Sequence, residues 1–167
     1  LSRNRALFSA DTIVKKLYKN NRFKNLISKK LRIKKSSTIK SQIRKMILEK
    51  KINLKKLGTI IHPLVRKEMR KFVRQNKKKD VLLFEIPLLI ESKLMKNFDT
   101  VIFIKSKKTT RLKRFLKKGG KKNLFNILNN KQLSDSQKIK FCEHVVVNEK
   151  NKDILKKKLL AIIRKYE

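Results

Sequence analysis

Asp11 is the first residue whose position suggests chemistry. Residues 6–9 form a short apolar run typical of a strand, and residues 13–18 then place apolar side chains on one helical face. A carboxylate at this junction could act as a general base or lie beside a metal ion. An aspartate there is also a good N-cap, which accepts hydrogen bonds from free backbone N–H groups. The spacing alone favours the N-cap.

A second set of candidates follows the apolar run at residues 81–84. This run and residues 101–104 are short, β-branched and aromatic, as is typical of strands buried on both faces of a parallel sheet. The segment between them can cross over between parallel strands and is too long for a hairpin. Because ligands of α/β domains bind at the carboxyl ends of strands, we expect Glu85, Pro87 and Glu91 at the binding edge.

His62 precedes Pro63, where the helical pattern of residues 53–61 is interrupted and a new helix is expected from Pro63 to about residue 75. Its imidazole could donate a hydrogen bond to a phosphate or a sugar. A satisfied structural histidine is the better interpretation of His62 alone. One cysteine and two histidines give no zinc pattern.

Arg111 and Arg114 are three residues apart and share the face of a predicted basic helix, which the turn Gly119-Gly120 follows. Such a segment can close over a polyphosphate, or it can be one more solvated basic face. Neither GxxxxGK[ST] nor GxGxxG occurs in the sequence, and no Ser/His/Asp triad can be argued.

Elements of an α/β domain must position these side chains. The chain has 167 residues, of which 40% are hydrophobic, enough for one domain with a core. A third β-branched run at residues 144–147 and an amphipathic helix at 152–166 complete the pattern. The single Cys142 excludes an internal disulfide framework and fits a reducing compartment. No apolar run is long enough to span a bilayer, and no signal peptide is visible.

The formal net charge of +37 suggests an anionic partner such as nucleic acid, phosphates or a membrane surface. The lysines are scattered over every helical segment, and abundant Lys, Asn and Ile are expected from an AT-rich genome. Two tyrosines and no tryptophan leave few platforms for base stacking. Base composition is the better explanation for most lysines. A non-catalytic RNA- or ribosome-associated protein is the alternative, and it predicts tight RNA binding with a steep salt dependence.

Several segments, in order, resemble the dephospho-coenzyme A kinase family. That family shows a D-x-D-x-I turn, an HP-x-V segment, a PLL-x-E turn, a basic lid and a closing AD-x-V-I-x-N. The matching segments are SADTIVKKLY (9–18), IIHPLVRKEM (60–69), FEIPLLIE (84–91), TTRLKRFLKK (109–118), and Gln132 with CEHVVVN (142–148). Their order and spacing fit nearly the whole chain.

The resemblance implies a P-loop kinase fold of the nucleoside-monophosphate-kinase type, a parallel sheet with helices on both faces. It implies a single domain over residues 1–167, with a helical CoA-binding region at about 20–75 and a lid at about 109–132. The implied reaction transfers the γ-phosphate of ATP, with Mg²⁺, to the 3′-hydroxyl of dephospho-CoA, the last step of coenzyme A synthesis in the cytoplasm. Another nucleotide kinase with a different acceptor stays possible, although the HPLV and PLLIE segments argue against it.

The same resemblance assigns roles to residues. Asp11 would be the base toward the 3′-hydroxyl, while Ser9 replaces the first acid of the family's turn. Lys118 replaces a usual arginine, which removes a bidentate fork but keeps the charge, and no residue is assigned to a metal. The implied acceptor-site residues are His62, Pro87, Leu88, Leu89 and Glu91, and the implied lid and ATP residues are Arg111, Arg114, Lys118 and Asn148.

The start of the chain departs from the family. Members of the family begin with a strand and a G-x-x-G-x-GK-[ST] loop, about twenty residues before the D-x-D turn. In this sequence only ten residues precede Asp11. We therefore expect an N-terminally truncated sequence. In the resembled fold the missing strand is central and is flanked by the strands at 81–84 and 101–104.

Overall fold

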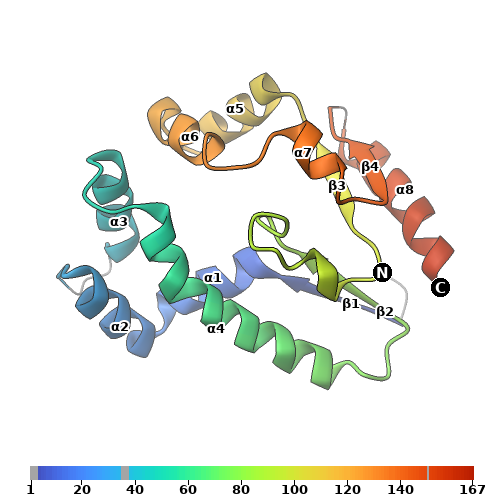
Figure 1. The fold of residues 1–167 in the computed structure, drawn as a ribbon, viewed down its shortest axis with the longest axis horizontal. Coiled ribbons are helices and arrows are strands. Elements are labelled where there is room, and N and C mark those ends of the chain that lie inside the picture. The colour runs from blue at the N-terminus through green and yellow to red at the C-terminus, as the bar shows by residue number, and fades with distance from the viewer. Residues whose placement is uncertain (1–3, 35–37, 150) are drawn as a thin grey trace. The chain divides into compact units, whose positions relative to one another are not determined.

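The computed structural model describes residues 4–34, 38–149 and 151–167. It divides into two compact units, unit 1 (Leu1–Pro87) and unit 2 (Leu88–Glu167). Each contains a pair of parallel strands with helices around it (Figure 1). The mixed α/β character predicted from the sequence is confirmed.

In unit 1, β1 (Arg5–Ser9) pairs in parallel with β2 (Val81–Glu85), and Ser9 lies opposite Glu85 at the carboxyl end. The long helix α4 (Leu54–Gln75), green in Figure 1, packs against this pair. Its Phe72 ring lies 5.6 Å from the ring of Phe8 and 5.5 Å from that of Phe84, measured between centroids. Phe8 is only 3% exposed, so this aromatic cluster is the contact between helix and strands.

Three shorter helices complete unit 1: α1 (Ala10–Lys19), α2 (Asn21–Leu31) and α3 (Ile39–Leu48). The side chain of Asn20 caps α2 by accepting from the backbone N–H of Phe23 at 3.1 Å. The side chains of Ile27 and Ile39 are fully buried. Together with α4, α2 and α3 occupy the helical region expected at about residues 20–75.

The break predicted at His62-Pro63 is wrong, because α4 continues through Pro63. Proline has no N–H to donate, so the carbonyl of Thr59 loses its helical partner. Thr59 and Pro63 are both exposed, which lets water satisfy that carbonyl. Apolar contacts on both sides of the proline, at the buried Ile61 and at Phe72, keep the two halves in one helix.

In unit 2, β3 (Ile102–Lys105) pairs in parallel with β4 (His144–Val147). The other elements, in chain order, are η1 (Met95–Asn97), α5 (Lys108–Lys117), α6 (Lys122–Asn129), α7 (Asp135–Ile139), α8 (Lys152–Ile163) and η2 (Arg164–Tyr166). Helices α5 and α6 occupy the segment expected to form a lid.

All four apolar runs form strands as predicted, but the prediction that β2 and β3 are buried on both faces is wrong. Ile104 in β3 is 45% exposed, and β2 contains no fully buried residue. Among the described residues, β2 bonds only to β1 and β3 only to β4.

The turn between α5 and α6 depends on its glycines. Gly119 has a positive φ of 76°, which side chains disfavour. A Cβ at Gly120 would lie 2.1 Å from Cε1 of Phe115, whose ring packs on Phe125 with centroids 5.7 Å apart. Gly120 therefore lets the two helices meet through their phenylalanines.

We expect Gly120→Ala to destabilise the protein by about 1–3 kcal/mol, because the new methyl group displaces the Phe115 ring. Urea unfolding measures the change. Lys121→Ala is the control: its exposed side chain makes no capping hydrogen bond, so its effect should stay within about 0.5 kcal/mol. Equal stability of Gly120→Ala and the wild type would contradict this role of Gly120.

Candidate active site

Asp11 lies in the first turn of α1, immediately beyond the end of β1. The N-cap is Ser9, whose Oγ accepts from the backbone N–H of Thr12 at 3.3 Å, so the prediction of Asp11 as N-cap is wrong. The parallel register sets this turn beside the carboxyl end of β2 at Glu85. The Asp11 side chain is exposed, and within the described residues its carboxylate has no hydrogen bond or ion pair.

His62 lies near the middle of α4. Its ring covers Gly58 one turn earlier, where a Cβ would lie 3.1 Å from Cε1 of the imidazole. Partial burial, and secondarily the positive charge of Arg66, lower the pKa of His62 below its ordinary value of 6.5. The neutral imidazole is therefore favoured, and it keeps one N–H donor.

The turn that follows β2 contains the other predicted acceptor residues. The boundary between the units falls inside it, with Pro87 in unit 1 and Leu88 to Glu91 in unit 2. Leu88 is 39% exposed, whereas its neighbour Ile90 is buried. Backbone bonds from Lys93 to Ile90 (2.9 Å) and from Leu94 to Leu89 (3.1 Å) close the turn.

The Glu91 side chain bonds to α7 and to the segment before it. Its Oε1 accepts from Nζ of Lys138 at 3.0 Å and from the backbone N–H of Leu133 at 3.2 Å. The side chains of Lys138 and Glu91 are only 9% and 16% exposed, so this is a largely buried ion pair. Sequence reasoning missed Lys138 because nothing distinguishes it from the other lysines of this chain.

The structure brings together two predicted ATP residues, Arg114 and Asn148. The guanidinium of Arg114 lies 3.4 Å from Oδ1 of Asn148 and 3.4 Å from Oγ of Ser106. The Ser106 hydroxyl donates to the backbone carbonyl of Asn148 at 2.7 Å. Lys118 follows Arg114 by one turn, at the exposed C-cap of α5.

Glu149 holds the beginning of α5 in place. Its carboxylate accepts from the Thr110 hydroxyl and from the backbone N–H of Lys107. These two hydrogen bonds lower the pKa of Glu149, the Thr110 bond more strongly. Sequence reasoning missed this residue too, because its partners are 39 and 42 positions away along the chain.

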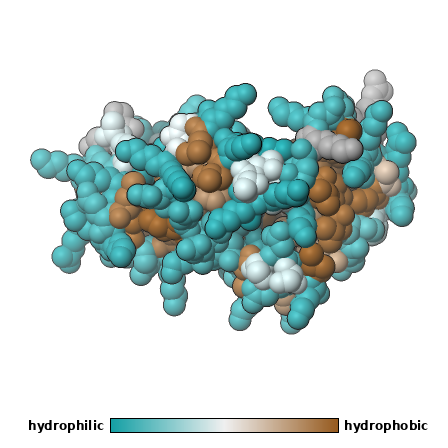
Figure 2. Space-filling model, turned by 90° about the horizontal axis from the view of Figure 1, so that it is seen from above, coloured by the Kyte–Doolittle hydropathy of each residue, from teal (hydrophilic) through white to brown (hydrophobic). Residues whose placement is uncertain are grey.

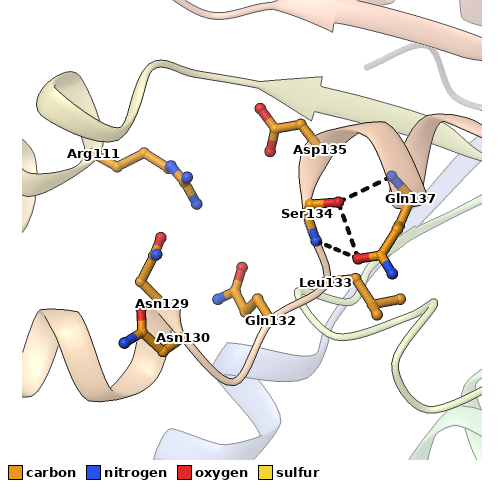
Figure 3. A pocket seen from close by; sticks show the side chains of 8 residues that line it. All are labelled: Arg111, Asn129, Asn130, Gln132, Leu133, Ser134, Asp135 and Gln137. Atoms are coloured by element: carbon orange, nitrogen blue, oxygen red, sulfur yellow. Dashed lines mark hydrogen bonds between the residues drawn. The ribbon is translucent and has the colours of Figure 1, made fainter.

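A polar pocket of about 470 Å³ lies in unit 2 between α5 and the segment that joins α6 to α7. Figure 3 shows the Arg111 guanidinium facing the amides of Asn129 and Gln132 across this space, with the Asp135 carboxylate near the top of the view. The Nε atom of Arg111 is buried and has no hydrogen-bond partner. The remaining lining residues are Asn130, Leu133, Ser134 and Gln137.

Part of this lining has a structural role. Ser134 and Gln137 form a capping box at the start of α7, so their polar atoms bond to each other and to the local backbone. Arg111 has no such internal partner in the described residues. Arg111 is therefore the side chain that would bind an anionic ligand in this pocket.

Among the described residues, no three His, Cys, Asp or Glu side chains gather as potential metal ligands. No helix in the described part of the chain is both long and apolar enough to cross a membrane.

The lowered pKa of His62 gives a prediction for stability. Between the lowered pKa and 6.5 the unfolded chain binds more protons than the folded chain, so the free energy of unfolding falls as pH drops through this window. We expect His62→Gln to lose this part of the pH dependence in urea unfolding between about pH 7.5 and about pH 5.5. Lys67→Gln, an exposed change on the same helix, should keep it. An unchanged slope in His62→Gln would contradict the assignment.

Comparison with known proteins gives a consistent match. The family model for dephospho-CoA kinase matches residues 10–153. The dephospho-CoA kinase of Bartonella henselae is 28% identical over 165 residues, which cover 95% of this chain and 84% of that protein. The enzyme of Rickettsia typhi is 29% identical over 161 residues, covering 96% and 84%.

The fold has a solved counterpart. The crystal structure of TT1252 from Thermus thermophilus superposes with a TM-score of 0.72 at 17% identity, covering 98% of this chain and 86% of that one. At this identity the likeness speaks for the fold alone. The family model spans most of the sequence, and the chain belongs to the dephospho-CoA kinase family.

Proposed function

We propose that Asp11 is the general base in the ATP-dependent phosphorylation of the 3′-hydroxyl of dephospho-CoA, the reaction of this family. The observation that carries the proposal is the placement of Asp11. It is an exposed carboxylate without an internal partner in the described residues, and it follows β1 directly at the carboxyl edge of the β1–β2 pair. Open parallel sheets bind ligands at this edge.

In the proposed reaction, Asp11 accepts the proton of the 3′-hydroxyl. The 3′-oxygen then forms a bond to the γ-phosphorus of ATP, while the bond from that phosphorus to the bridging oxygen breaks and ADP leaves. Phosphoryl transfer relies chiefly on positioning and on stabilising charge at the phosphate oxygens. ATP and dephospho-CoA are the proposed partners, in the cytoplasm, and Mg²⁺ accompanies ATP.

The acceptor side of the proposal rests on His62 and the turn after β2. The favoured neutral imidazole of His62 offers one N–H donor. Pro87, Leu88 and Leu89 would form the apolar part of the acceptor site. Glu91 would contribute mainly by holding this turn, since its Oε1 is already bonded to Lys138 and Leu133.

The nucleotide side of the proposal rests on the lid. Arg111 faces a pocket and has no internal partner for its buried Nε. Arg114 lies against Asn148 at the end of β4. Lys118 adds an exposed positive charge one turn later. Guanidinium groups suit phosphate because they offer paired donors in a planar fork.

The RNA-binding alternative is not favoured. Figure 2 shows hydrophilic side chains interrupted by several hydrophobic patches on the face that it presents. Lysines occur in each of the helices α1 to α8 rather than in one of them. Such a spread fits base composition better than a built nucleic-acid surface. Any RNA binding should therefore be nonspecific and should weaken steeply with salt.

A coupled assay of ADP release with dephospho-CoA tests the reaction. The sequence contains no GxxxxGK[ST] motif, and losing each phosphate-binding contact of that kind costs a factor of roughly 10²–10³ in rate. We therefore expect slow turnover by the 167-residue chain, with ADP release that depends on dephospho-CoA. Turnover as fast as in an enzyme that contains this motif would contradict the cost inferred for its absence. ADP release that is no faster with dephospho-CoA than without it would contradict the proposed activity.

Asp11→Asn tests the proposed base in the same assay. We expect kcat to fall by roughly 10²–10⁴-fold with little change in KM for ATP, because the amide cannot accept the proton. Asp153→Asn is the matched control, since Asp153 is also an exposed aspartate in the first turn of a helix, α8. A wild-type kcat in Asp11→Asn would exclude Asp11 as the base.

A further inference from the structure

Lys138 is buried next to the pocket but is not one of its lining residues. Its Nζ lies 3.0 Å from Oε1 of Glu91 and 3.1 Å from Oε1 of Gln132. It also lies 5.9 Å from the centroid of the Phe103 ring in β3. A buried ammonium is costly unless it is paired and hydrogen-bonded, and these contacts satisfy it.

The contact with Lys138 determines which way the Gln132 amide faces. An ammonium group has three donors and no acceptor, so the Gln132 atom next to it must be the oxygen. The amide NH₂ therefore turns away from Lys138. Figure 3 shows the nitrogen of Gln132 on the side of Asn129, within the pocket that Arg111 also lines.

Hydrogen-bond donors therefore point into the pocket from two of its lining residues. Arg111 offers its guanidinium, and Gln132 offers its NH₂ group. The charge of Lys138 is balanced by Glu91, so Arg111 is the positive group that faces the space. Donors of this kind match the oxygens of a phosphate group. The Asp135 carboxylate in the lining suits a ligand that also brings hydroxyl donors, as the ribose of a nucleotide does.

We propose that Lys138, on α7, is a positioning residue next to the lid, which aims the Gln132 NH₂ group at a nucleotide phosphate held between Gln132 and Arg111. The inference rests on the proposed function, because it takes the nucleotide to be the ligand of this pocket. It adds a specific role for Lys138, through Gln132, that the motifs of the chain do not indicate.

Side-chain amide NMR tests the proposal with ADP as the probe and the ¹⁵N-labelled 167-residue chain as the protein. The Gln132 NH₂ resonance, assigned by its loss in Gln132→Glu, should shift as ADP saturates the wild type. In Lys138→Met we expect this shift to disappear and the Kd for ADP to rise about tenfold or more. Lys138→Arg keeps donors for both partners and should recover much of the response. Lys140→Met, an exposed change just after α7, should behave as the wild type.

Gln132→Glu covers the case in which Lys138→Met fails to fold. The glutamate still offers an oxygen to Lys138 but replaces the donor with a negative oxygen, so ADP should bind at least tenfold more weakly than to the wild type. Wild-type affinity in this variant would overturn the proposal. A Gln132 resonance that ADP shifts equally in Lys138→Met and the wild type would also overturn it.

Two further outcomes separate this inference from the proposed function. If ADP moves backbone resonances near Arg114 and Asn148 but leaves Gln132 unchanged, the pocket is not the phosphate site and only this inference fails. If ADP shifts no resonance, the inference fails for this chain, and turnover in the coupled assay then decides the proposed function separately.

Discussion

Acidic side chains are scarce in this chain, with 12 aspartates and glutamates against 49 lysines and arginines. Three of the glutamates make hydrogen bonds on which the arrangement of unit 2 depends. Glu143 accepts from the backbone N–H of Val101 at 2.6 Å, Glu149 accepts from that of Lys107, and Glu91 accepts from that of Leu133. Each bond joins positions 42 residues apart. A lysine or arginine cannot replace any of them, because those side chains have no acceptor.

These acceptors arrange the lid as well as the core. Glu143 secures the entry to the β3–β4 pair, and Glu149 secures the first turn of α5 against the end of β4. The guanidinium of Arg114, on α5, consequently reaches Asn148. Glu91 holds the segment before α7 through the backbone N–H of Leu133, and it pairs with Lys138, which is buried in α7. These few acidic side chains thus position two basic side chains of unit 2, Arg114 and Lys138.

Unit 1 is held together differently, by aromatic packing. Phe8, Phe72 and Phe84 bring α4 onto the β1–β2 pair, with adjacent ring centroids 5.5–5.8 Å apart. The burial of Phe8 fixes β1 in register with β2, and this register leaves Ser9 and then Asp11 at the carboxyl edge. The Asp11 carboxylate and its helix are in this way positioned by apolar contacts that lie along the strands rather than at the edge itself.

The sequence by itself determined the strands, the family and the candidate carboxylate at Asp11. Short β-branched runs and ordered motifs are local signals, and they can be read without knowing which segments meet. The tertiary structure decided that Ser9 rather than Asp11 caps α1, and that α4 continues through Pro63. It also decided that Lys138 and Glu149, among 49 cations and 12 anions, have specific partners. Glu91 lies 47 positions from Lys138, and the partners of Glu149 lie 39 and 42 positions away. Contacts between such distant positions depend on how the chain folds, so no periodicity or spacing in the sequence reveals them.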